Sequence, residues 1–472
     1  MGEECSKPIP TCSECAKLQR RLAQLEALVA EQHAQIEALT ARLNQNSSNS
    51  SKPPSSDVPW RKPPAKTPTG RKPGAQDGHP GHCRVRLPPE RLKQVVVYVP
   101  EVCEACQAPL PKTPGPHDPP PSWHQIAELP ALLAEITEYQ GHARTCPCCG
   151  RRTRAEIPPH IQAHTVGPNL AATLSYLSGR CHDSKRNVQE IAETVFAVPL
   201  SLGTVVKLEQ EMSAALEEPH TQALAAVRVA AFKNVDETGW AKGGKLCWLW
   251  VAATVTVVVF QIHAKRGKDG LKALLGKCCG IIGSDRWGAY AQLPLHERQI
   301  CWAHLKRDFQ KLIDLGVATQ ALGRTGRKVA QEIFGVWKDF KDGRIDRATL
   351  QTQLQPIRFR FHKTLRRGSQ GVDKKTKRFC RRLLKVYDAL WTFAAVEGVE
   401  PTNNHAERMV RPAVLWRKSS FGNHSGAGCR FTERILTTVQ TLRLQKRPVL
   451  DFLRRALAAH RARTQAPTLL TA

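Results

Sequence analysis

The most regular alternation of apolar and polar positions lies near the N-terminus, where apolar residues recur in steps of four and three. The apolar positions are Leu18, Leu22, Leu25, Val29, Ile36, Leu39 and Leu43. Gln32 occupies the one position of this series that is polar. A sustained a/d heptad is typical of a coiled coil, so we predict a helix over residues 16–44 that forms a homo-oligomer. The alternative is a helix that packs its apolar stripe on the body of the same chain.

A different pattern, rich in β-branched residues, appears in the middle of the chain. Three runs predict strands at Phe232 to Trp240, Leu246 to Ala252 and Val255 to Ile262. A short helical segment and a fourth apolar run at residues 280–284 follow. Antiparallel strands, a crossover helix and a further strand are the order of a ribonuclease H-like domain, which we assign to residues 226–430 of a multidomain α/β protein.

Three acidic residues stand where such a domain would bring them together. Asp236 closes the first strand, Asp285 follows the fourth, and Glu407 lies near the start of a helix that Asn403 would cap. Carboxylate oxygens suit Mg²⁺ or Mn²⁺, and two such ions stabilise the attacking and leaving oxygens of a phosphoryl displacement. Glu237 is the main competitor for a ligand role, although strand alternation points it to the other face.

The residues around these acids resemble the DDE transposases of the insertion-sequence 66 (IS66) family. The motifs are DETGW at Asp236, SDRWGAY around Asp285, CWAHLKRDF from Cys301 and TNNHAERMVRP around Glu407. The likeness extends over nearly the whole chain and includes NSSNSSKPPSSD and GAQDGHPGH. It implies Asp236, Asp285 and Glu407 as the catalytic and metal-binding triad, and small accessory proteins encoded by the same element as partners.

Cysteine pairs predict a second metal site, upstream of the sheet. The chain has 16 cysteines and no secretory signal pattern, which favours thiols and metal over a disulfide framework. Two CxxC motifs predict a zinc ribbon over residues 91–160, in which structural Zn²⁺ is bound by Cys103, Cys106, Cys146 and Cys149. Cys148 is an alternative fourth ligand, and Ile136 to His142 is the strand expected before the second motif.

Helical periodicity over residues 161–220 includes a candidate helix-turn-helix. Asn187 to Phe196 predicts one helix, a short turn follows, and Ser201 would cap a second helix that could enter a DNA major groove. An ordinary helical hairpin that supports the catalytic domain is the alternative. The residues that we expect to contact DNA here are Lys185, Arg186 and Lys207.

The remainder of the chain is predicted to be mainly helical. Arg298 to Trp302 predicts a fifth strand, and His304, just beyond it, is interpreted as a structural or capping residue close to the site. Periodicity over about residues 305–399 predicts a helical insertion in the domain, and residues 431–460 predict closing helices.

Two arginines follow the helix acid. Arg411 lies four residues after Glu407 and would share its helical face, while Arg408 is the next residue along. Both arginines are expected to contact DNA, and the alternative for Arg411 is an ion pair with Glu407.

Composition indicates the kind of partner. Lys and Arg total 70 against 41 Asp and Glu, a formal net charge of +29, which favours a polyanion and counterion release on binding. Residues 45–90 predict a basic flexible linker that either follows phosphates or is solvated. The longest nearly apolar run, Leu249 to Phe260, is too short to span a bilayer, so we expect no membrane partner and a cytoplasmic, nucleoid-associated protein.

Together these features predict a DNA transposase. Such an enzyme would bind the terminal inverted repeats of its element, cut there, and join the exposed 3′-hydroxyl to target DNA. One alternative is a metal-dependent DNA nuclease without strand transfer. Another is a zinc-containing DNA-binding regulator with a silent catalytic site.

Overall fold

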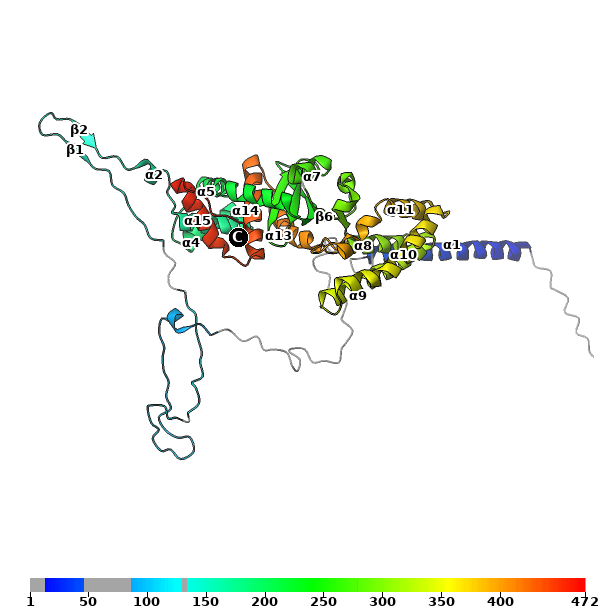
Figure 1. Ribbon diagram of the computed structural model, residues 1–472, viewed down its shortest axis with the longest axis horizontal. Helices are drawn as coiled ribbons and strands as arrows, with labels where there is room; N and C mark the ends of the chain where they lie inside the picture. Colours follow the sequence, from blue (N-terminus) through cyan, green and yellow to red (C-terminus); the bar gives the residue numbers. More distant parts are fainter. Residues whose placement is uncertain (1–12, 46–85, 117, 130–133, 278, 472) are drawn as a thin grey trace, which may run out of the picture. The chain divides into compact units, whose positions relative to one another are not determined.

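The structure is a computed structural model that describes residues 13–45, 86–116, 118–129, 134–277 and 279–471 (Figure 1). The chain divides into two units, residues 60–134 and the remainder, and each is considered by itself. The predicted linker over residues 45–90 lies mostly outside the described residues. Among the helices of the described residues, none combines the length and apolar character that crossing a bilayer requires.

The N-terminal helix α1 runs from Ser13 to Leu43, where a helix is predicted. Its apolar stripe faces solvent, since Leu22 is 59% exposed and Val29 is 62% exposed. An exposed apolar stripe gains stability when a second helix covers it. The structure has one chain, so the coiled-coil dimer stays a prediction.

A five-stranded sheet contains all five predicted strands. In chain order they are β3 (Phe232–Lys242), β4 (Lys245–Ala253), β5 (Val258–His263), β6 (Ile281–Ser284) and β7 (Arg298–Ile300). The spatial order is β5-β4-β3-β6-β7, in which β4 pairs antiparallel with β3 and β5, and β6 pairs parallel with β3 and β7. The change from antiparallel to parallel pairing follows the crossover helix α7 (Lys268–Leu275).

The third strand begins later than its β-branched run predicts. Thr254 Oγ1 accepts hydrogen bonds from the backbone N–H groups of Thr256 at 3.3 Å and Val257 at 2.9 Å, which closes a turn. Val255 is therefore 79% exposed, and β5 starts at Val258. Thr residues compete for backbone groups in this way at turns, and a run of β-branched residues does not reveal it.

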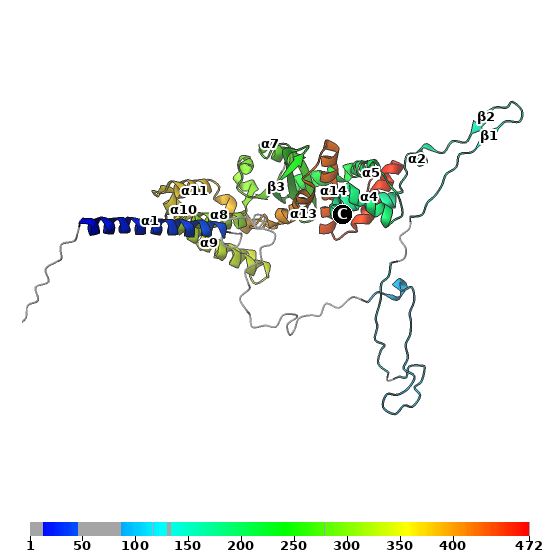
Figure 2. The same ribbon diagram turned by 180° about the vertical axis from the view of Figure 1, so that it is seen from behind.

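Two C-terminal helices pack on the sheet, as both views of the ribbon show (Figures 1 and 2). Helix α13 (Asn404–Ser420) lies against β3 and β4 and carries Glu407 in its first turn. Helix α14 (Gly426–Leu444) lies against β5. Thr441, Thr437 and Glu433 accept hydrogen bonds from alternate N–H groups of β5, at Val258, Phe260 and Ile262.

The spacing of these side chains explains why the helix and the strand fit together. Four helix residues advance about 6 Å, and two strand residues advance about 6.6 Å. A polar residue at every fourth helix position therefore meets every second strand residue. The contact satisfies backbone groups that would otherwise be buried without a partner.

A layer of helices precedes the sheet in sequence and packs with the last helix of the chain. Ser201 caps α5 as predicted, because its Oγ accepts from Thr204 N at 3.1 Å, and α4 packs on α5. The helices of this layer are α3 (Pro168–Tyr176), α4 (Lys185–Thr194), α5 (Leu202–Ala215) and α6 (Glu217–Val229), and the last helix is α15 (Val449–Ala462). The one-turn helix α2 (Pro159–Gln162) comes before them in sequence. A π-helical turn, η3 (Leu177–Cys181), joins α3 to α4.

The predicted insertion is helical and has a hydrophobic core of its own. Trp302, Phe309 and Phe361 are fully buried there. Its helices are α8 (Trp302–Asp314), α9 (Val317–Lys341), α10 (Arg347–Gln370), α11 (Lys374–Leu384) and α12 (Thr392–Ala395). Ile300 of β7 belongs to this core, and Phe232 and Ile281 pack against it, so the insertion is anchored on the edge of the sheet that carries β6 and β7.

The two CxxC motifs adopt the same turn, although they lie in different units. In the first, Cys103 N donates to Ala108 O and Gln107 N donates to Cys103 O; in the second, Cys146 N donates to Arg151 O and Gly150 N donates to Cys146 O. Backbone N–H groups inside each turn lower the pKa values of the Cys103 and Cys146 thiols. Thiolates are the form that binds zinc, so each turn favours a metal ligand.

The strand predicted before the second motif is wrong in position. Residues 136–142 are extended without strand pairing, and the strand is β1 (Ala143–Thr145), which pairs antiparallel with β2 (Arg152–Arg154). The turn at Cys146 sets this register, because it joins the two strands directly. Zinc binding by the four cysteines stays a prediction.

Candidate active site

Asp236 lies on the central strand β3, beside the parallel strand β6. The register pairs Asn234 with Gly283, and its continuation by two residues sets Asp236 across from Asp285. Burial raises the pKa of Asp236 well above its usual range, with further increases from Glu237, Glu407 and Asp285. The three predicted triad residues therefore lie close enough to repel one another when charged.

Glu237, the residue after Asp236 on β3, has partners of its own within the fold, although its charge also raises the pKa of Asp236. Its side chain is 2% exposed, and it accepts hydrogen bonds from Arg266 Nε at 3.0 Å and Tyr290 Oη at 2.7 Å. Burial raises its pKa, while Tyr290 and Arg266 oppose the increase. Glu237 is thus neutralised by the protein itself and is a poor candidate for a metal ligand.

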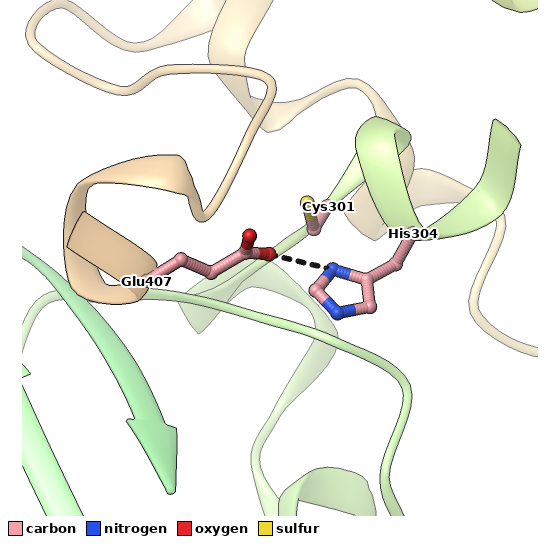
Figure 3. Close-up of side chains that lie close together, drawn as sticks. All are labelled: Cys301, His304 and Glu407. Carbon is pink, nitrogen blue, oxygen red and sulfur yellow. Dashed lines mark ion pairs between the residues drawn. The ribbon is translucent and has the colours of Figure 1, made fainter. Parts of the chain in front are cut away.

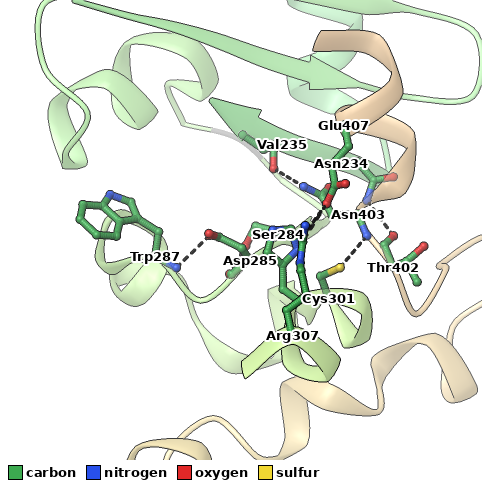
Figure 4. A network of polar contacts seen from close by, with 11 residues as sticks. Asn234, Val235, Ser284, Asp285, Trp287, Cys301, Arg307, Thr402, Asn403 and Glu407 are labelled. Carbon is green, nitrogen blue, oxygen red and sulfur yellow. Dashed lines mark hydrogen bonds and ion pairs between the residues drawn. The ribbon is translucent and has the colours of Figure 1, made fainter. Parts of the chain in front are cut away.

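Asp285 directly follows β6 and begins a turn (Figure 4). Its Oδ1 accepts a hydrogen bond from Trp287 N at 2.8 Å, which fixes one carboxylate oxygen. The side chain of Arg298, on the neighbouring strand β7, is close enough for Asp285 to influence its pKa, although burial lowers that pKa overall. A carboxylate that accepts one hydrogen bond from a backbone N–H still has oxygen lone pairs that can bind a cation.

Glu407 meets two basic side chains from α8 (Figure 3). Its Oε1 lies 3.4 Å from His304 Nδ1. The same oxygen lies 3.4 Å from Arg307 Nη2, which Figure 4 shows. Burial lowers the pKa of His304, as does Arg307, while Glu407 opposes the change. His304 therefore contacts the candidate triad directly, and Arg307 is a site residue that the sequence reasoning missed.

The start of α13 is fixed to the strand that carries Asp236. Asn403 Nδ2 donates to Val235 O at 2.9 Å, and Asn234 Nδ2 donates to Thr402 O at 3.4 Å (Figure 4). Asn403 N donates to Cys301 Sγ at 3.1 Å, which adds the start of α8 to the same network. These bonds set the position of Glu407 relative to Asp236, so Asn403 positions the helix through its amide rather than as a side-chain cap.

Two ligand sets can be tested against this geometry. Cys301, His304 and Glu407 bring one donor atom each to within 4.8 Å of one another. However, burial raises the pKa of Cys301 to about 11, so its sulfur is a thiol that accepts backbone N–H groups. Asp236, Asp285 and Glu407 do not form such a compact group of donor atoms in the described residues. Metal binding by these three carboxylates stays a prediction, which the preference of hard divalent cations for oxygen ligands supports.

The basic residues predicted to contact DNA differ in their surroundings. Lys185 pairs with Glu209, whereas Arg186 and Lys207 are exposed. Arg408 and Arg411 are also exposed, and neither pairs with Glu407 in the described residues. The alternative of an Arg411–Glu407 pair is therefore wrong, because α8 supplies the partners of the glutamate instead.

The sheet and helix α13 together carry the three carboxylates of the candidate site. The chain is thus an α/β protein with an acidic candidate active site. The profile of the Transposase IS66 family matches residues 166–430, which is more than half of the chain and includes all three carboxylates. The chain belongs to this family. It is therefore a protein of a transposase family.

Two further similarities concern other parts of the chain. A family of unknown function, DUF6444, matches residues 7–85, which include α1. The uncharacterized protein y4qI of Sinorhizobium fredii is 26% identical over 236 residues, which cover 44% of this chain and 43% of that protein. The chain thus aligns with less than half the length of that relative.

Proposed function

We propose that the protein is a DDE-type DNA transposase with a ribonuclease H-like catalytic domain. It binds the ends of a mobile element, cuts the DNA there and transfers the exposed 3′ end to target DNA. The observation that supports this most directly is that the family match includes Asp236 on β3, Asp285 directly after β6 and Glu407 in the first turn of α13. Carboxylates gathered at a family-matched site are typical of a centre that functions with bound cations.

The triad Asp236, Asp285 and Glu407 would hold two Mg²⁺ or Mn²⁺ ions, which stabilise charge on the attacking and leaving oxygens of phosphoryl transfer. Arg307 and His304 orient Glu407 from α8. Asn403 keeps α13 against β3, so the carboxylates stay in register when DNA binds. These residues position groups and carry no covalent intermediate.

The proposed reaction has two steps that balance without a protein nucleophile. Water attacks the phosphodiester at the element end, the bond to the 3′ oxygen breaks, and that oxygen leaves as a hydroxyl. The 3′-hydroxyl then attacks a phosphodiester of target DNA, and the 3′ oxygen of the target leaves. In each step an incoming oxygen, from water or from the 3′-hydroxyl, replaces a 3′ oxygen on phosphorus, so no oxidant or energy-rich co-substrate is required.

Other parts of the chain would recognise DNA and assemble the complex. Helices α4 and α5 serve as a helix-turn-helix, with Arg186 and Lys207 near phosphates. The two cysteine turns form a zinc ribbon that stabilises a DNA-binding module, which their lowered thiol pKa values support. Helix α1 pairs two copies as a coiled coil, and small accessory proteins of the same element join the complex.

The test is cleavage and joining of labelled element-end DNA by the full chain with Mg²⁺. Asp236→Asn, Asp285→Asn and Glu407→Gln should each abolish both products while DNA binding is kept. Glu400→Gln is the control and should be fully active, because Glu400 is a half-buried acid in the loop before α13 that pairs with Lys341. Activity in any triad variant would remove that residue from the site.

The same experiment separates the alternatives. Nicked products without joined products would indicate a nuclease. End-specific binding without cleavage by the wild type, in the presence of either metal, would indicate a DNA-binding regulator.

A further inference from the structure

A second group of basic residues surrounds a cavity beside α13. The cavity has a volume of about 450 Å³ and lies between η3, α13 and α14. Aspartate and glutamate are absent from its lining. The polar side chains that line it are Arg180, His182, Arg408, Arg411, Gln440 and Arg443.

The four arginines of the cavity differ from other arginines on the same helices. Arg434 of α14 pairs with Glu217, and Arg417 of α13 donates to Thr238 and to the Gly239 carbonyl. In contrast, no carboxylate of the described residues forms an ion pair with any of the cavity arginines. Four like charges around one cavity repel one another, so an anion in the cavity would relieve that cost.

Two neutral side chains in the cavity are also donors without a partner. Gln440 is 5% exposed, and its Nε2 forms no hydrogen bond in the described part of the chain. His182 Nε2 is buried and unpartnered as well. A buried donor without an acceptor lowers stability, so a cavity that collects two of them favours a ligand that brings acceptors.

The backbone holds His182 in place at the edge of this cavity. The residue follows η3 in the left-handed region, with φ of 65°, and its ring stacks on Trp416 at a centroid distance of 5.1 Å. A non-glycine residue adopts this conformation only when its surroundings fix it. The donor at Nε2 is therefore presented at a defined position.

We propose that this cavity binds backbone phosphates of the DNA that the active site acts on. Phosphodiester oxygens accept hydrogen bonds and carry negative charge, which matches both the arginines and the neutral donors. Arg408 directly follows Glu407, so a strand that reaches the triad passes close to the cavity. The inference rests on the proposed function and adds Arg180, Arg443, Gln440 and His182 to the DNA-binding residues.

The test compares two double variants that remove the same charge. Arg180→Gln with Arg443→Gln changes the cavity, and Arg454→Gln with Arg455→Gln changes an arginine pair beside Asp451 on α15. Affinity for a DNA duplex is measured by fluorescence anisotropy over a range of salt concentrations. The cavity variant should lower the slope of log K against log salt by about two, one for each lost phosphate contact. The control should keep the wild-type slope.

A neutral variant tests the same cavity without a change of charge. Gln440→Met should weaken DNA binding by roughly threefold and leave the salt slope unchanged, because one uncharged hydrogen bond is lost. The lower salt slope of the double variant and the weaker binding of Gln440→Met should each be the same on element-end DNA and on unrelated DNA. Phosphate contacts carry no sequence information.

The outcomes separate this inference from the proposed function. If the wild type binds DNA and the cavity variant has the same slope of log K against log salt, the cavity is not a phosphate site. That result would leave the transposase proposal intact. Wild type that binds no DNA would overturn both. Inorganic pyrophosphate that raises the Tm of the wild type at micromolar concentration, but not that of the cavity variant, would assign the cavity to a small soluble phosphate and overturn the DNA assignment.

Discussion

Two regions beside α13 carry side chains of opposite charge. The acidic site gathers Asp236, Asp285 and Glu407, and the cavity gathers arginines from three elements. Glu237 offers the contrast, because Arg266 and Tyr290 neutralise it within the fold. Glu407 has His304 and Arg307 beside it, and the cavity arginines form no ion pair in the described residues. We propose that a ligand completes each region: cations in one and phosphates in the other.

The strongest way to separate the two regions is to remove one charge from the acidic site. Asp285→Asn should lower the rate of DNA cleavage by about a thousandfold, because several kcal/mol of transition-state stabilisation are lost. The salt slope of DNA binding, which reports on the cavity, should stay at the wild-type value. A parallel loss of slope and rate would mean that the two regions act as one site.

A buried carboxylate outside both regions tests whether a raised pKa alone marks a site. Burial raises the pKa of Glu433 to about 7, while its Oε1 accepts from Ile262 N at 2.6 Å. Because the folded-state pKa is above the unfolded value of about 4.5, the free energy of unfolding should fall as pH rises between these values. Glu433→Gln keeps the acceptor and should stabilise the protein at pH 8 by up to about 3 kcal/mol.

Activity is the readout that distinguishes Glu433 from the triad. Glu433→Gln should retain cleavage of element ends, whereas the matched change Glu407→Gln should abolish it. Denaturant unfolding at pH 5 and pH 8 measures the stability difference. Equal stability of wild type and Glu433→Gln at pH 8 would contradict the raised pKa.

Cation binding can be measured without catalysis. Mn²⁺ at a hundred times its Kd should stabilise the wild type by about 2.7 kcal/mol, seen as a rise in Tm. Asp236→Asn should lose most of this rise, and the Arg180→Gln, Arg443→Gln double variant should keep it. A rise that persists in Asp236→Asn would place the cation elsewhere, with the cysteine turns as the next region to test.

The smallest expected effect concerns the neutral donors of the cavity. Gln440→Met removes a buried unpartnered Nε2 and should raise the stability of the DNA-free protein by about 1 kcal/mol. The thermal unfolding midpoint should therefore rise as DNA affinity falls. Lower stability in this variant would mean that Gln440 has a partner within the folded chain.

The β-branched and apolar runs predict β3 and β6, but not the roles of the acids near them. The prediction that Asp236 closes its strand is wrong, because β3 continues beyond it to Lys242. All three acids required the family resemblance, because an acid at a strand end commonly caps a turn and an acid in a first helical turn is common for its interaction with the helix dipole. Cys301 and His304 lie in a quoted motif, but only the structure brings them to Glu407.

Other site residues could not be predicted because their contacts cross long stretches of chain. Arg307 reaches Glu407 from α8, 100 positions away. Arg180 and Arg443 meet at the cavity only because η3 and α14 pack together, which no local periodicity reports. The prediction of a strand at residues 136–142 is wrong for a local reason. The cysteine turn joins β1 directly to β2, so the strand pairing lies at β1.

The contact between α14 and β5 has a consequence for self-association. An outermost strand with free N–H groups is a template on which another chain can add a strand and begin aggregation. Here Thr441, Thr437 and Glu433 occupy alternate N–H groups of β5, so the helix takes the place of a sixth strand. Helix α14 therefore blocks the addition of a strand from a second copy at the β5 edge of the sheet. Association of two copies would then use another surface, such as the apolar stripe of α1.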